Sequence, residues 1–471
     1  MRRNSLAAFV TSTSVSLLLV ACVPSVPDEA KPDVEPVAPP SSSQQEVPIT
    51  ETSPDWELTA SPVAAEVCKI PDGRPAEMQA LRPGALTLGS YGMSNVGFPA
   101  SPDLISVTGE SRYLAVAVSF PDMPGEPEDL DGYLREQTGL MTEWAEFWSQ
   151  GSHQYNFDVI EGWLEVPSTS DKFRVNDQAR SERSFGVHSA LASEIAFAIG
   201  PSIDWDKVDG ILAVFPLSFD AFPHDWNGRG DPVDTPMGVQ RMFYYGGGPF
   251  HLTSMNGIPL ETKRSLLWSF WIHEILHSQG MNLHSPGNGW AVGLDRNQYP
   301  VGSGKFSGAV NAWELFKVGW IRDEQVHCLD AREMFEPTQV ILTPLEIFGG
   351  ERKMAMVRTG DYSGLLVEAR RPVGYTEWAP EDSGVMVYRI DTTVMNDRSG
   401  EGQDDCGNNP NYAKWAYFIP PNGATGLEDS CYFEDFLLGE GDMVMVDGVK
   451  IELVHSSEGA DFLLVEPDEL Q

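Results

Sequence analysis

The chain has 471 residues, of which 41% are hydrophobic and 10% aromatic, a composition typical of globular rather than disordered proteins. This length favours two domains with extensions over one compact core. The formal net charge of −38, from 69 acidic and 31 basic residues, argues against nucleic acid and against an anionic membrane surface as binding partners.

Residues 1–22 have the pattern of a bacterial lipoprotein signal peptide. Two arginines are followed by an apolar run that is too short and too rich in Ser and Thr for a membrane span. The run ends in Leu-Val-Ala-Cys, which resembles the lipobox, whose cysteine receives a lipid. The pattern predicts export and a lipid anchor at Cys22, on the outer face of a bacterial membrane. An ordinary signal peptide with a chance cysteine is the alternative.

Residues 23–65 are rich in Pro, Ser and Glu and have almost no apolar periodicity. Such a segment cannot bury enough apolar surface to offset its chain entropy. We therefore predict a disordered tether, which its prolines keep extended, between the membrane and the folded part of the chain.

Four cysteines follow Cys22 in the sequence. An even number of cysteines in an exported protein favours disulfides, with three possible connectivities. The favoured pairs are Cys406 with Cys431, which are close in sequence, and Cys68 with Cys328.

Helix and strand patterns alternate over residues 66–325. Short apolar runs predict strands within 113–124, 155–167 and 208–219. Amphipathic spacing predicts helices within 129–151 and 180–200, each closed by a glycine. These mixed elements predict one domain that contains both helices and strands.

Residues 326–471 change to a succession of short strand-like runs separated by Gly, Pro, Asp or Ser. Asp447-Gly448, between two apolar runs, is a strong hairpin signal. Many short strands with turn signals predict an all-β, sandwich-like domain. The predicted class of the whole chain is therefore α+β.

Residues 265–280 predict a buried helix, because apolar residues lie nearly all round its axis. On this helix His273 and His277 are four residues apart, so both imidazoles project from one face and can share a metal. This spacing suits two corners of a tetrahedral Zn²⁺ site. Glu274 is placed to act as general base on a water that the metal activates. Gly280 permits a sharp turn after the helix. The alternative to a metal site is a pair of buried structural histidines.

The third metal ligand has more than one candidate. His284 follows the turn closely and one extra loop residue can deliver it to the metal, whereas Asp295 and Glu314 offer more distant carboxylates. The prediction is a zinc site on His273, His277 and one of these three residues, with His284 favoured.

The order of several segments resembles the peptidase M6 (immune inhibitor A-like) zinc metalloproteases, with some similarity to gametolysin-type enzymes. The matching segments are residues 113–124, 147–167, 273–280, 307–321, 365–391 and 441–453. The resemblance implies a zincin-like domain, zinc on His273 and His277, and Glu274 as the catalytic residue. The chain departs from the family at Leu283, which stands where the third ligand is expected, and no Met-Gly turn follows.

Together these patterns predict a zinc-dependent endopeptidase at the bacterial cell surface, acting on proteins or peptides. The alternative is a weak or inactive protease-like lipoprotein used for binding or adhesion. Leu283 favours this alternative, while Glu274 favours the enzyme. A solute-binding lipoprotein leaves the zinc helix unexplained.

Three further segments carry weaker patterns. Residues 68–72 superficially resemble the cysteine switch of some metzincins, although a disulfide at Cys68 is favoured. Residues 396–405 offer oxygen ligands for Ca²⁺ without the spacing of an EF-hand, and an acidic loop is the alternative. The aromatic-rich segments 222–230 and 241–254 precede the zinc helix and are candidates for the lining of a substrate cleft, with His224 and His251 interpreted as loop residues rather than metal ligands.

Overall fold

The computed structural model describes residues 56, 60–73, 95–100, 105–125, 130–174, 183–216, 226–246, 267–281, 309–333, 336–373, 383–393, 415–425 and 433–468. The predicted signal peptide with Cys22, most of the tether, residues 396–405 and the cysteines 406 and 431 lie outside these ranges. The described residues form a mixture of helices and strands in which strands predominate, in agreement with the predicted α+β class. Among them, no helix has the length and hydropathy needed to cross a membrane.

The first sheet has five strands in the order β2-β1-β3-β5-β4. Strands β2, β1, β3 and β5 run parallel to their neighbours, whereas the edge strand β4 runs antiparallel to β5. The bounds are Gly109–Ser119 for β1, His153–Glu165 for β2, Gly210–Val214 for β3, Trp226–Thr235 for β4 and Gly238–Gly246 for β5. Strands β1, β2 and β3 lie at the positions that the apolar runs predict.

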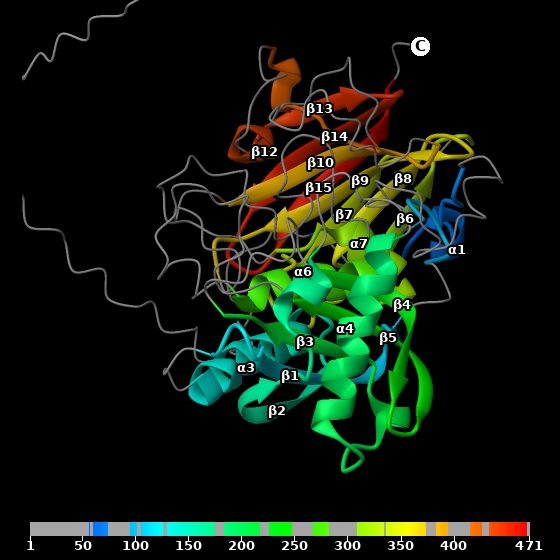
Figure 1. Cartoon of the computed structure of the whole chain (residues 1–471). Coiled ribbons are helices and arrows are strands. Elements are labelled where there is room, and N and C mark those ends of the chain that lie inside the picture. Colours follow the sequence, from blue (N-terminus) through cyan, green and yellow to red (C-terminus); the bar gives the residue numbers. More distant parts are fainter. Residues whose placement is uncertain are drawn as a thin grey trace, which may run out of the picture. The chain divides into compact units, whose positions relative to one another are not determined.

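Both faces of this sheet are covered, because successive side chains of a strand point to opposite sides. On β1, Tyr113 and Ala115 belong to one core cluster, whereas Leu114 and Val116 belong to another. The first cluster includes residues of helices α3 (Leu130–Trp148) and α6 (Leu267–Ser278), and the second includes residues of α4 (Arg183–Ile199). Helices therefore pack on both sides of the sheet (Figure 1).

Strands β4 and β5 form a hairpin for which the sequence carries no predicted strand. Residues 226–230 and 241–246, the described parts of the two aromatic segments, lie in these strands. Strand β4 is rich in Gly, Asp and Pro, which are depleted in strands, so its pattern does not reveal it. At the edge of a sheet a strand tolerates proline, and Pro232 of β4 pairs with Arg241 of β5. His224 and His251 lie outside the described residues.

Two further sheets contain the C-terminal strands. One has six strands, in the order β11-β10-β9-β8-β6 with β12 beside β10, and the other has four, in the order β13-β14-β15-β7. Their bounds are Val326–Asp330 (β6), Thr338–Leu342 (β7), Met354–Arg358 (β8), Ser363–Arg370 (β9), Gly384–Asp391 (β10), Ala416–Phe418 (β11), Leu437–Leu438 (β12), Met443–Val446 (β13), Val449–Ser456 (β14) and Asp461–Pro467 (β15). Asp447 and Gly448 connect β13 and β14 with φ values of 50° and 77°, as expected for the predicted hairpin turn.

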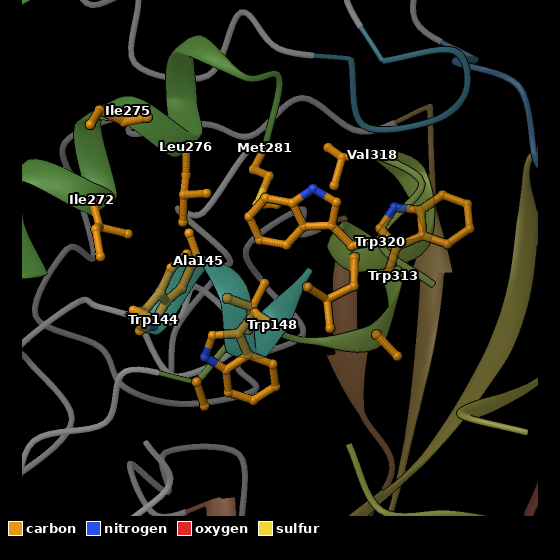
Figure 2. Close-up of a cluster of buried hydrophobic side chains, with 14 of the residues drawn as sticks. Trp144, Ala145, Trp148, Ile272, Ile275, Leu276, Met281, Trp313, Val318 and Trp320 are labelled. Atoms are coloured by element: carbon orange, nitrogen blue, oxygen red, sulfur yellow. The ribbon is translucent and has the colours of Figure 1, made fainter. Parts of the chain in front are cut away.

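The six-stranded sheet is buried on both faces. On β8, Ala355 and Val357 join a core cluster that they share with the four-stranded sheet, whereas Met354 and Met356 join the cluster of α3 and α6. The cluster of α3 and α6 thus contains residues from both sides of residue 325, the predicted domain boundary. Figure 2 shows part of it, where Trp144 and Trp148 of α3 lie among side chains of α6 and the neighbouring Trp313 and Trp320.

A disulfide joins Cys68 to Cys328, the pairing that the sequence favours, across a separation of 260 residues. Cys68 ends the short helix α1 (Ala65–Cys68), and Cys328 lies on β6. The Ser61 hydroxyl donates a hydrogen bond to the Cys328 carbonyl (3.1 Å) and accepts one from the Cys328 N–H (2.8 Å). The last residues of the predicted tether therefore pack against β6.

Candidate metal centre

Helix α6 carries the His-Glu-x-x-His motif and is buried on nearly all sides. Among its residues only Trp268 and His273 are half-buried, and the others are buried. Its apolar side chains Ile272, Ile275 and Leu276 belong to the core cluster that it shares with α3, and Figure 2 shows Ile272 and Leu276 pointing towards α3. The backbone N–H of Trp268 donates to the side chain of Gln137 on α3 (3.1 Å), which satisfies one N–H near the start of the helix. The motif is thus held on a rigid element.

The structure brings His273 and His277 together through their Nε2 atoms. These two nitrogens are 3.0 Å apart, and the ring planes are nearly perpendicular, at 89°. Two imidazole nitrogens that each lie about 2.0–2.1 Å from a tetrahedral zinc ion are about 3.3 Å apart. The pair therefore fits two adjacent ligands of one zinc ion with a small adjustment.

The turn at the end of α6 determines which ring nitrogen of His277 faces His273. Gly280 has a φ of 94°, and its N–H donates to the His277 carbonyl (3.1 Å) while the Met281 N–H donates to the Leu276 carbonyl (3.0 Å). These two bonds form a Schellman motif, in which glycine tolerates the left-handed conformation. The turn places the Met281 carbonyl 3.1 Å from Nδ1 of His277. Since a carbonyl only accepts, Nδ1 carries the hydrogen and Nε2 keeps its lone pair for a metal.

Glu274 lies three residues before His277, so the two side chains are neighbours on the helix surface. Glu274 is buried, with 6% of its surface exposed. The backbone carbonyl of Glu274 accepts the hydroxyl of Ser278 at 3.2 Å. The carboxylate is therefore carried on a fixed part of the helix beside the histidine pair.

Of the three candidates for the third ligand, only Glu314 lies within the described residues. His284 and Asp295 lie outside the described residues. Glu314, on α7 (Ala312–Lys317), forms an ion pair of 2.8 Å with Lys317, and both side chains are completely buried. Within the described ranges, no group of three or more His, Cys, Asp or Glu side chains is arranged to hold a metal ion.

Gln279, which directly precedes Gly280, is a buried residue of this region that no motif in the sequence identifies. It is 1% exposed, and its side chain contacts Tyr155 and His153 of β2 and the backbone of Ser106. The only signal in the sequence is a polar residue directly after the helix, next to Gly280. Its partners are more than 120 residues away in the chain, so spacing cannot reveal them.

Comparison of the chain with protein-family models found no match, and comparison with curated proteins found none either.

Proposed function

We propose that the chain is a zinc-dependent endopeptidase with a zincin-like catalytic domain. The observation that carries this proposal is the convergence of the two Nε2 atoms of His273 and His277 at 3.0 Å, with Nδ1 of His277 bonded to the Met281 carbonyl. The contact between the two rings alone would also fit a structural pair of core histidines. A backbone partner on the far nitrogen of one ring is typical of metal-binding histidines, because it fixes tautomer and orientation.

In this function His273 and His277 hold zinc through Nε2, and the third ligand comes from the segment after α6, with His284 favoured over Asp295. When bound, zinc supplies Lewis-acid chemistry, polarising the scissile carbonyl and lowering the pKa of water. Glu274 accepts a proton from the attacking water and donates it to the leaving amine. The buried position of α6 keeps Glu274 and both imidazoles in a fixed relationship during proton transfer.

The fold supports the same proposal. The helix with the motif packs in a core cluster that it shares with α3 and with strands of the first sheet, so the chemistry lies on regular elements of the scaffold rather than on a free loop. The two C-terminal sheets share a core and support the proposed β-sandwich. The Cys68–Cys328 disulfide is typical of an oxidising compartment and supports export with an anchor at Cys22.

A protease-like binding lipoprotein is the second candidate. Leu283 stands where the resemblance expects a ligand, and Glu314 is engaged by Lys317. Both observations reduce the number of candidates for the third ligand. Without a third ligand, the histidine pair would bind zinc only weakly.

The test uses the full chain purified in detergent, with one zinc equivalent added. Wild type, Glu274→Gln and His277→Ala are compared for zinc content after dialysis and for cleavage of an unfolded protein. Glu161→Gln, which changes an exposed carboxylate of β2, is the matched control. We expect cleavage by wild type and control, zinc without cleavage in Glu274→Gln, and neither in His277→Ala.

Two results distinguish the candidates. Zinc binding by wild type without cleavage of any of a panel of unfolded proteins would favour the binding lipoprotein. Cleavage that persists in Glu274→Gln would overturn the assigned role of this residue. Removal of zinc by a chelator should abolish cleavage, and added zinc should restore it.

A further inference from the structure

We propose that Gln279 is a positioning residue for the metal ligand His277, which it holds in place through the turn after α6. This inference rests on the proposed zinc site and extends it to a residue outside the motif. Gln279 touches neither metal nor substrate in this proposal. It acts on the turn that presents the Met281 carbonyl to Nδ1 of His277.

The amide of Gln279 is held at both of its polar atoms. Nε2 donates to the Ser106 carbonyl (2.8 Å) and lies 3.1 Å from Nε2 of His153, while Oε1 accepts the hydroxyl hydrogen of Tyr155 (2.7 Å). Because the Ser106 carbonyl only accepts, the amide nitrogen must face it, and the orientation of the group follows. Of these three polar partners, His153 and Tyr155 are at most 1% exposed, as is Gln279 itself, whereas Ser106 is exposed.

The state of His153 is consistent with this arrangement. Burial lowers its pKa to about 4, against the opposing effect of a backbone hydrogen bond with Thr108. The imidazole is therefore neutral near pH 7, and its Nε2 can accept the second hydrogen of the Gln279 amide. The Ser111 hydroxyl lies 3.2 Å from the same nitrogen. The network thus extends from Gln279 through His153 of β2 to β1.

These contacts connect the turn to the first sheet. Gly280 and Met281 are tied to α6 by their own backbone bonds, which fix the turn relative to the helix. The Gln279 side chain adds a tie to strand β2 and to the segment before β1. The Met281 carbonyl is therefore fixed against the sheet as well as against the helix, and so is the imidazole that it orients. Partners that orient a metal ligand typically change metal affinity by about 10–100-fold when they are removed.

A matched pair of tyrosines provides the test. Tyr155 and Tyr113 are both at most 1% exposed, and their rings touch at 5.7 Å between centroids. In the described part of the chain, only the Tyr155 hydroxyl donates to Gln279. Tyr155→Phe and Tyr113→Phe each remove one buried hydroxyl from the same core, but only the first breaks a contact of the turn.

The full chain in detergent is titrated with zinc in competition with a chromophoric chelator. Wild type, Gln279→Ala, Tyr155→Phe and Tyr113→Phe are compared. Thermal unfolding of each metal-free protein measures stability separately, and the visible absorption of the cobalt-substituted protein reports on ligand geometry. We expect the zinc Kd to rise about tenfold or more in Gln279→Ala and less in Tyr155→Phe. Tyr113→Phe should keep the wild-type Kd and cobalt spectrum.

Each outcome decides the inference. Wild-type zinc affinity in both Gln279→Ala and Tyr155→Phe would overturn it while leaving the zinc site intact. An equal loss in Tyr113→Phe and Tyr155→Phe would also overturn it, because the effect would then follow core stability. If Gln279→Ala does not fold, the comparison of the zinc Kd of Tyr155→Phe with that of Tyr113→Phe decides the inference alone. Absence of zinc binding by wild type would overturn the proposed function together with this inference.

Discussion

The carboxylate of Glu314 lies 2.8 Å from the ammonium of Lys317, one turn further along α7, and both side chains are completely buried. Lys317 also donates to the carbonyl of Asn95 at 2.8 Å. Two charges can be buried together in this way because each compensates the other, whereas one alone is costly. The pair therefore gives Glu314 a structural role, although its spacing from the motif made it a candidate zinc ligand.

Glu314→Gln should lower the free energy of unfolding by about 3–5 kcal/mol, because the Lys317 ammonium loses its buried counter-charge. The zinc Kd of the folded protein should stay unchanged. Urea unfolding of the metal-free protein and chelator competition measure the two quantities. Glu161→Gln, which breaks an exposed pair with Arg135, should cost less than about 1 kcal/mol. Weaker zinc binding by Glu314→Gln with unchanged stability would instead place Glu314 in the metal centre.

Loss of the disulfide should destabilise the protein without changing its metal ligands. Cys328→Ser opens a covalent link between residues 260 apart, and removal of such links typically costs about 2–5 kcal/mol. Urea unfolding under non-reducing conditions measures the change. The double variant Cys68→Ser, Cys328→Ser should unfold close to the single variant, since both remove the same bond. Equal midpoints for Cys328→Ser and wild type would contradict this prediction.

Stability should fall at mildly acid pH in part because of His188. Burial lowers the pKa of His188 to about 4, opposed by a backbone hydrogen bond with Asn227, from an ordinary value of 6.5. Between these two values the unfolded state binds more protons than the folded state, so stability decreases as pH falls from 6.5 towards 4. His188→Gln, which keeps a donor near the Asn227 carbonyl, should reduce this dependence by up to about 1.4 kcal/mol per pH unit.

Urea unfolding at several pH values between 4 and 7.5 measures the slope for wild type and His188→Gln. The wild-type curve should be steeper than the His188→Gln curve between pH 4 and 6.5, and the two curves should run parallel above pH 6.5. Parallel curves throughout this range would show that the proton uptake on unfolding does not come from His188.

Much of the local structure follows from the sequence because it depends on short-range patterns. Strand β1 is a short apolar run, and α3 and α4 carry apolar residues at helical spacing, so period and length identify them. The β4–β5 hairpin is missed because its stability comes from pairing with the rest of the sheet. Residues such as Pro232 and Gly228 give a loop signal that tertiary pairing overrides.

In the candidate site, too, some features follow from local sequence patterns and others depend on tertiary packing. The positions of His273 and His277 on one helical face follow from their spacing of four, and the turn at Gly280 follows from the conformational freedom of glycine. The contact of Gln279 with Tyr155 joins residues 124 apart in the sequence, and no local pattern encodes it. The partner of Glu314 is close in sequence, but whether Lys317 is buried with it depends on the packing of α7.

The six-stranded sheet has no face turned to water, since Met354 and Met356 pack towards α3 and α6 while Ala355 and Val357 pack towards the four-stranded sheet. A fragment that ends near residue 325 would lose one wall of its own interior, and the complementary fragment would expose a row of methionines. Limited proteolysis should therefore not release two independently folded halves. The chain is expected to unfold as one cooperative unit. Loosening of the C-terminal strands should therefore also destabilise the helix that carries the histidines.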